Sequence, residues 1–180
     1  MCEKIIYRKS VESDREQLEK LFNESFGTLA SEGGALKQIK DRYVVAEVIA
    51  DETELGDKES YQPRLIAVSG ILPVVQSEYH GYEITWTCTS KAYRKRGIIV
   101  EILKQCEKEL EDDHLPIYCD CWRIRDNEHI NMVSVMKHFG MHPIIDSRIR
   151  RMYPHNKCCH GCVYAEEGCY CYGDLYMKSR

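Results

Sequence analysis

Basic residues crowd a short turn in the middle of the chain, directly before an apolar pattern with helical spacing. The turn ends at Gly97 and contains four of them: Lys91, Arg94, Lys95 and Arg96. A helix N-terminus has unpaired N–H groups and a partial positive charge, and glycine lets a ligand approach the backbone closely. Such a turn suits a phosphate or pyrophosphate, and positive side chains strengthen the site. A solvated basic turn before an ordinary helix is the alternative interpretation.

Cysteines crowd a second segment, near the C-terminal end. The chain has ten cysteines, and five of them fall between residues 158 and 171. Two closely spaced pairs stand out: Cys159 with Cys162, and Cys169 with Cys171. Four thiolates suit tetrahedral Zn²⁺, and a site closed by four sulfurs is structural rather than catalytic. Three neighbouring side chains could replace one ligand: His155, Cys158 and His160. A redox pair, or thiols without a ligand role, are the alternatives.

Four other cysteines fit ordinary positions in strands and helices. Cys119 and Cys121 alternate along a predicted strand, so their side chains point to one face. We expect these two, together with Cys88 and Cys106, to be small buried residues. A disulfide framework is not expected inside a reducing cell.

The elements that position these residues alternate between strands and helices. β-branched and alternating patterns predict strands over 4–9, 43–50, 64–75, 79–89, 117–122, 141–151 and 171–178. Four helices are also predicted. The first begins at a Ser13–Glu16 capping box and stops at Gly27, and the second covers 33–42. The third runs from Gly97 to Leu110, and the fourth covers 127–139 and stops at Gly140. This order indicates one mixed α/β (α+β) domain over residues 1–180. The cysteine-rich segment 155–171 is an insertion in its last hairpin.

The segment Arg94-Lys95-Arg96-Gly97-Ile98-Ile99 resembles motif A of the GCN5-related N-acetyltransferase (GNAT) superfamily, whose signature is R/Q-x-x-G-x-G/A. Ile99 stands where the family usually has Gly or Ala. The element order over 4–151 also looks like the whole family domain, and Phe139-Gly140-Met141 looks like the end of its motif B. The resemblance implies a mixed, mostly antiparallel central sheet flanked by helices and splayed between strands 4 and 5.

The resemblance also implies a site for acetyl-CoA in that opening. The pantetheine arm would pair with backbone groups near Thr87 and Thr89, and the pyrophosphate would bind the backbone amides of 94–99. The Thr87 N–H would polarise the thioester carbonyl and stabilise the oxyanion. The asparagine of motif B corresponds to Asn131 or Asn127.

An amine acceptor attacks the thioester only after it loses a proton, so a general base is expected. Glu83 is the candidate, because it lies fourteen residues before Gly97, where the histone acetyltransferase branch has its catalytic glutamate. A surface glutamate is the alternative interpretation, and His80 is a nearby alternative base. Many family members use a motif B tyrosine as the acid, but Met136 stands near that position. The acid could instead be one of three side chains, or water: Tyr93, Ser134 and His138.

The predicted function is transfer of an acetyl or other acyl group from acetyl-CoA to a primary amine, by direct attack in a ternary complex. The alternative is a non-catalytic CoA-binding, metal-sensing or redox-sensing module on the same fold.

The formal net charge of −4 argues against a nucleic-acid partner. No apolar run reaches the ~20 residues that span a bilayer, and the first residues contain no apolar signal core. We therefore expect a cytoplasmic protein with no membrane partner. The acceptor cleft is expected near residues 24–42 and the last hairpin, and a homodimer is left open.

Overall fold

A computed structural model describes residues 3–32, 34–49, 63–75, 80–111, 114–123, 132–144, 151–152 and 172–180. Its strands are β1 (Lys4–Lys9), β2 (Val44–Ile49), β3 (Arg64–Val75), β4 (His80–Thr89), β5 (Ile117–Arg123), β6 (His142–Pro143), β7 (Arg151–Met152) and β8 (Tyr172–Lys178). Its helices are α1 (Arg15–Phe26), α2 (Leu29–Glu32), α3 (Ile98–Lys108) and α4 (Val133–Phe139), with 3-10 turns at Glu12–Asp14 and Lys91–Tyr93.

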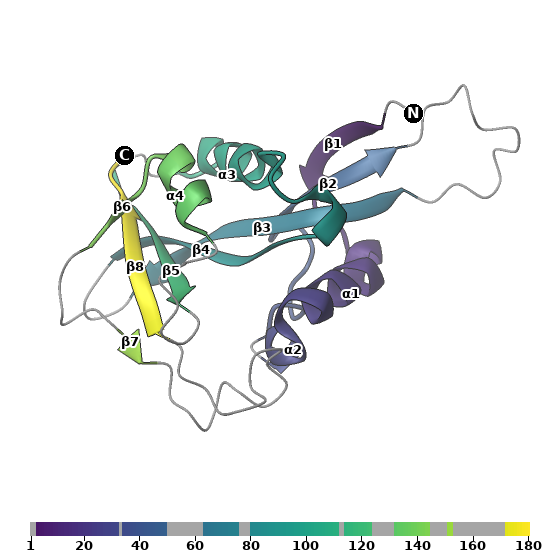
Figure 1. Cartoon of the computed structure of the whole chain (residues 1–180), viewed down its shortest axis with the longest axis horizontal. Coiled ribbons are helices and arrows are strands. Elements are labelled where there is room, and N and C mark those ends of the chain that lie inside the picture. The colour runs from purple at the N-terminus through teal and green to yellow at the C-terminus, as the bar shows by residue number, and fades with distance from the viewer. Residues whose placement is uncertain are drawn as a thin grey trace, which may run out of the picture.

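The strands form one mixed sheet, in the order β1-β2-β3-β4-β5-β8-β6, with β7 paired to β8. Every pairing is antiparallel except that between β4 and β5, which run parallel. These two strands pair at two positions, Tyr82 with Ile117 and Glu83 with Tyr118. The described parts of β4 and β5 form no pairs beyond these, so the expected splay between strands 4 and 5 is confirmed (Figure 1).

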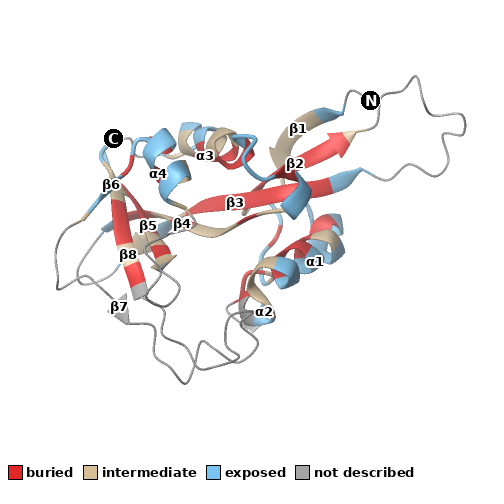
Figure 2. Cartoon of the chain, viewed as in Figure 1, coloured by how far each residue is buried: buried red, intermediate tan, exposed pale blue. Residues whose placement is uncertain are grey.

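Helices cover both faces of the sheet (Figure 1). One face, here called the α3 face, packs α3 and α4 against a core that includes Ile66, Ile102 and Met136. The other, here called the α1 face, packs α1 and α2 against a core that includes Leu18, Phe22 and Tyr43. The strands β2 and β3, buried over most of β2 and over 65–71 of β3, separate the two cores (Figure 2).

Sequence patterns predicted most of these elements correctly. The apolar residues of α3 are buried: Ile98, Ile99, Ile102, Leu103 and Cys106. Gly27, Gly97 and Gly140 lie at helix boundaries with φ of 64°, 76° and 84°, a region that glycine enters at little cost. The described part of the predicted helix over 127–139 is α4, and residues 127–131 lie outside the described residues.

Three local predictions differ from the structure. The Ser13–Glu16 capping box is wrong: Asp14 accepts a hydrogen bond from the Val11 N–H at 2.8 Å and closes a 3-10 turn before α1. The helix expected over 33–42 is also wrong, because the second helix is α2 and the described residues 34–42 form turns. The strand expected over 141–151 appears as the two short strands β6 and β7, with residues 145–150 outside the described residues.

A buried ionic cluster ties β1 to the start of α1 and to β2. Arg8 donates to both Asp14 oxygens at 2.7 and 2.8 Å and to Glu47 Oε2 at 2.5 Å. Both carboxylates are buried. Burial alone would raise the pKa of Asp14, but the hydrogen bonds from Arg8 and from the Val11 N–H outweigh it and hold that pKa below its usual value.

We expect Asp14→Asn to lower the free energy of unfolding by about 2 kcal/mol at neutral pH, since hydrogen bonds to charged groups contribute about that much. A lowered folded-state pKa stabilises the fold above the unfolded-state pKa near ~3.9, and the stabilisation is lost as pH falls through the folded-state pKa. Urea unfolding between neutral and acidic pH should therefore show the difference between wild type and variant shrinking in acid. A pH-independent difference would contradict this assignment.

The described part of the chain contains no helix that is both long and apolar enough to cross a bilayer.

Candidate active site at the opening between β4 and β5

A β-bulge lies in β4 beside the opening. Thr85 pairs with Gly70 of β3 and Cys88 pairs with Val68, so β4 has one more residue than β3 across this stretch. The bulge contains Trp86 at φ 48°, an unusual conformation for a bulky residue. It turns Trp86 toward α1, while the Thr87 hydroxyl lies 2.7 Å from the Ser69 hydroxyl. The β4 edge that faces β5 has no strand partner beyond Glu83 in the described chain.

The basic turn bends its backbone into two left-handed residues directly before α3. Lys95 has φ 64° and Gly97 has φ 76°. The first N–H groups of α3 have no partner within the helix, and such groups at a helix N-terminus suit an anion. A Cβ on Gly97 would meet nothing within 4 Å, so the space beside this turn is open. The Ile99 side chain is buried in the core under α3, so it does not occupy that space.

The basic side chains of the turn differ in the contacts that they make with the rest of the protein. Arg94 Nε donates to the Thr89 carbonyl at 3.1 Å. The Arg96 guanidinium lies 4.8 Å from the centre of the Tyr93 ring and 3.9 Å from Glu3. Lys95 is exposed and makes no ion pair with the described residues. Binding an incoming anion would therefore not break an ion pair of Lys95 with the described residues.

The three side chains considered for the acid occupy different surroundings. The Tyr93 hydroxyl donates to Glu3 at 2.7 Å and accepts from Arg64 at 2.6 Å, and burial raises its pKa. These contacts tie Tyr93 to the N-terminal end of the sheet. Ser134 and His138 are exposed on α4. The identity of the acid stays a prediction.

Glu83 lies where β4 and β5 part. It pairs with Leu72 on one side and Tyr118 on the other, and it is partly exposed. Its neighbours Tyr82 and Ile84 belong to the core under α3, so by strand alternation Glu83 points to the α1 face. His80, the alternative base, is exposed at the first position of β4.

A cavity of about 690 Å³ lies along part of residues 24–42, where the acceptor cleft is expected, and reaches the strand next to Glu83. Leu72, the cross-strand partner of Glu83, lines it together with Lys37, Asp41 and Arg42. Acidic and basic side chains both contribute, so its charge alone selects no acceptor.

The described cysteines are buried core residues, as predicted. Burial raises the pKa of Cys88 to about 12 and that of Cys106 to about 11. Cys119 and Cys121 point to the α3 face with their sulfurs 3.6 Å apart, and a hydrogen bond between them together with burial raises the pKa of Cys119 well above its usual value. The thiols of Cys88, Cys106 and Cys119 therefore stay protonated at neutral pH, which makes them poor nucleophiles.

The other proposed ligands and contacts fall outside the described residues: Cys159, Cys162, Cys169, Cys171 and Asn131. Among the described residues, no three His, Cys, Asp or Glu side chains gather in a metal-binding arrangement. A zinc clamp on the last hairpin stays a prediction.

No sequence pattern predicted that Trp86 and Asp120 would lie at the opening. Trp86 faces α1 only because the bulge shifts the alternation of β4. The Asp120 carboxylate lies over Gly173, where any Cβ would overlap Asp120 Oδ1. Gly173 lies inside a predicted strand, and a glycine there often marks a close approach of another group. That glycine was the one sequence feature that could have indicated the position of Asp120.

Solved structures of acetyltransferases resemble this chain along almost its full length. NAA60 of Arabidopsis thaliana, in complex with a bisubstrate analogue, is 17% identical over 98% of both chains, with a TM-score of 0.62. A chain of the NatC complex bound to Gag peptide and CoA is 13% identical over 98% of this chain and 99% of that one, with a TM-score of 0.62. A GNAT-family acetyltransferase of Bacillus cereus is 11% identical over 98% of both chains, with a TM-score of 0.56. The sequence matches no protein-family model and no curated protein. These structural likenesses show that the chain has the GNAT fold.

Proposed function

We propose that this chain, which has the GNAT fold, is an acyl-CoA-dependent N-acyltransferase that transfers an acetyl group to a primary amine. The opening between β4 and β5 carries the proposal, because it lies beside the basic turn at the start of α3. The relatives that were solved with CoA and with a bisubstrate analogue support a coenzyme in this fold. The whole chain acts as one domain in this proposal, with acetyl-CoA and an amine as its partners.

The coenzyme would lie along the unpaired edge of β4. Its pyrophosphate would bind the backbone amides of residues 94–99, reinforced by Arg94, Lys95 and Arg96. Its pantetheine arm would take the place of a neighbouring strand at Thr87 and Thr89. Among residues outside the described ranges, Asn131 is the proposed further contact.

The reaction would be a direct transfer. The acceptor ammonium gives a proton to Glu83, and the amine lone pair attacks the thioester carbonyl. The oxyanion that forms accepts a hydrogen bond from the Thr87 N–H. Collapse breaks the carbon–sulfur bond, the thiolate takes up a proton, and the nitrogen loses its second proton to give the amide. Placing both reactants in one opening supplies much of the acceleration.

We expect Lys95→Glu to raise the Kd of acetyl-CoA about tenfold or more, because it puts a negative charge beside the pyrophosphate. Isothermal titration measures this, and the effect should shrink as salt screens the charges. Lys20→Glu is the matched control: it makes the same charge change at an exposed position of α1. Equal affinities in both variants would place the pyrophosphate elsewhere.

The proposed function itself is tested in two steps. Absence of acetyl-CoA binding at millimolar concentration would overturn it. Binding without CoA release in a screen of primary amines would instead favour the alternative, a CoA-binding regulator without catalysis.

A further inference from the structure

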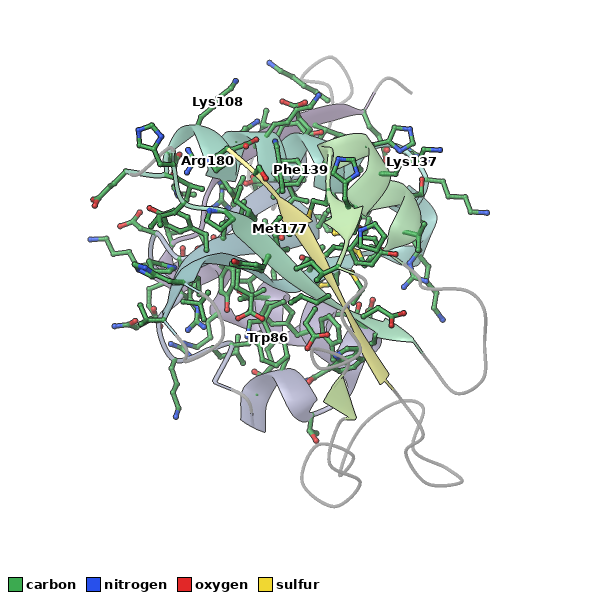
Figure 3. All side chains as sticks on the ribbon, turned by 90° about the vertical axis from the view of Figure 1, so that its left-hand side faces the viewer. Trp86, Lys108, Lys137, Phe139, Met177 and Arg180 are labelled. Carbon is green, nitrogen blue, oxygen red and sulfur yellow. The ribbon has the colours of Figure 1, made fainter. Side chains whose placement is uncertain are left out.

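Three aromatic side chains from separate elements meet on the α1 face of the opening. The ring of Phe26, at the end of α1, lies 5.8 Å from the ring of Trp86 on β4 and 6.0 Å from that of Trp122 on β5. Both contacts are edge-to-face. We call these three residues the aromatic wall. Figure 3 shows Trp86 on the side of the sheet that α1 and α2 cover. The wall therefore bridges the two strands where they are no longer paired.

The aromatic wall differs from the neighbouring core in its exposure. Phe22, one turn earlier on α1, is fully buried, whereas all three wall residues remain partly exposed. Cys121, beside Trp122 on β5, is buried on the α3 face. Trp86 also has a strained backbone, and such strain persists where the surroundings enforce it, often at functional sites. The wall thus keeps part of its aromatic surface accessible on the face opposite α3.

Two carboxylates border the aromatic wall on the same face. On β4, Glu83 is two residues before Thr85, where the bulge begins. On β5, Asp120 is two residues before Trp122, so strand alternation puts these two side chains on one face. Gly173 leaves the space that the Asp120 carboxylate occupies, since a Cβ there would overlap it. A site with aromatic surface and negative charge at its rim complements a cation with an apolar body.

We propose that the aromatic wall binds the acceptor, and that the acceptor is a primary amine with an aromatic ring on a short alkyl arm. The ring packs against Phe26 and Trp122, and the ammonium lies toward the two carboxylates. This inference rests on the proposed function, because it assigns the second substrate of the same opening.

The chain offers a direct readout, because Trp86 and Trp122 are its two tryptophans. All tryptophan fluorescence therefore reports on the aromatic wall. Titration with 2-phenylethylamine should change the emission and saturate, with at least tenfold tighter binding than ethylamine. The anion 3-phenylpropionate, which has a similar shape, should bind at least tenfold more weakly than 2-phenylethylamine, since the carboxylates repel it. Equal responses to all three compounds would overturn the proposal.

Turnover gives an independent measurement. For the wild type, kcat/KM should be higher for 2-phenylethylamine than for ethylamine, and Trp122→Ala should lower this ratio about tenfold. Trp122→Phe keeps an aromatic ring and should retain most of the ratio. Phe26→Leu provides a second test if Trp122→Ala fails to fold. A ratio unaffected by these substitutions would contradict the role of the wall.

The two hypotheses fail in distinguishable ways. If acetyl-CoA does not bind by calorimetry, the proposed function fails, and the assignment of an acceptor fails with it. If acetyl-CoA binds and other amines are acetylated with no preference for 2-phenylethylamine, only the aromatic-amine inference fails.

Discussion

Glu83→Gln is expected to lower kcat at neutral pH by at least 100-fold, with little change in the Kd of acetyl-CoA. General-base catalysis contributes about 10²–10⁴-fold, and glutamine cannot accept the ammonium proton. Glu83 lies where β4 and β5 part, on the face opposite α3, so it can reach an amine that enters from the α1 face. Steady-state kinetics with an accepted amine, and calorimetry with acetyl-CoA, measure the two quantities.

The pH profile separates a base from a binding residue. A carboxylate base works only when it is deprotonated, so the wild-type rate should fall as pH falls through its pKa, and the variant should lack that acidic limb. His80→Gln is the control, because it removes the alternative base from the same strand. An unchanged rate and profile in Glu83→Gln, with both lost in His80→Gln, would transfer the role to His80.

Gly81→Ala is expected to lower the free energy of unfolding by about 3 kcal/mol, at the upper end for overpacking. A Cβ at this position would overlap the backbone oxygen of Pro116, and backbone cannot move aside as a flexible side chain can. The same oxygen accepts the Tyr82 N–H at 2.9 Å. The substitution therefore forces β4 and β5 apart where they pair. Denaturant unfolding monitored by circular dichroism measures the loss.

Gly97→Ala is the matched comparison for stability. Its Cβ would meet nothing within 4 Å, so only the cost of a left-handed alanine remains, about 1–2 kcal/mol. A loss in Gly81→Ala no larger than that in Gly97→Ala would show that β4 and β5 adjust to the extra methyl group.

The elements that sequence patterns predicted best are those with a clear apolar period and a glycine at the boundary. In α3, five apolar side chains at helical spacing are buried, and Gly97 begins the helix as expected. The second helix was predicted in the wrong place because tertiary contacts, not local helix propensity, determine the conformation of residues 29–42. There Tyr43 is fully buried and its hydroxyl donates to the Ala35 carbonyl at 2.7 Å, which holds the segment as turns.

The candidate site was predictable only in part, for a similar reason. The basic turn is contiguous in the sequence, so its composition and its glycine revealed an anion site. The aromatic wall combines Phe26, Trp86 and Trp122, which are far apart in the chain and meet only through the β4 bulge and the end of α1. No alternation pattern reports a bulge, because the extra residue reverses the expected faces after it.

The two residue pairs between β4 and β5 also have a mechanical consequence. Elsewhere in the central sheet, neighbouring long strands are joined by ladders of five or more residue pairs, so separating them breaks many backbone hydrogen bonds. Along the line between β4 and β5, widening the gap mostly rearranges side chains such as Phe26 and Trp122. Among the described long strands, this line is therefore the one that the fewest backbone pairs cross. Beyond Glu83, a change in its width would move Trp86 relative to Trp122 without breaking a described backbone pair between these two strands.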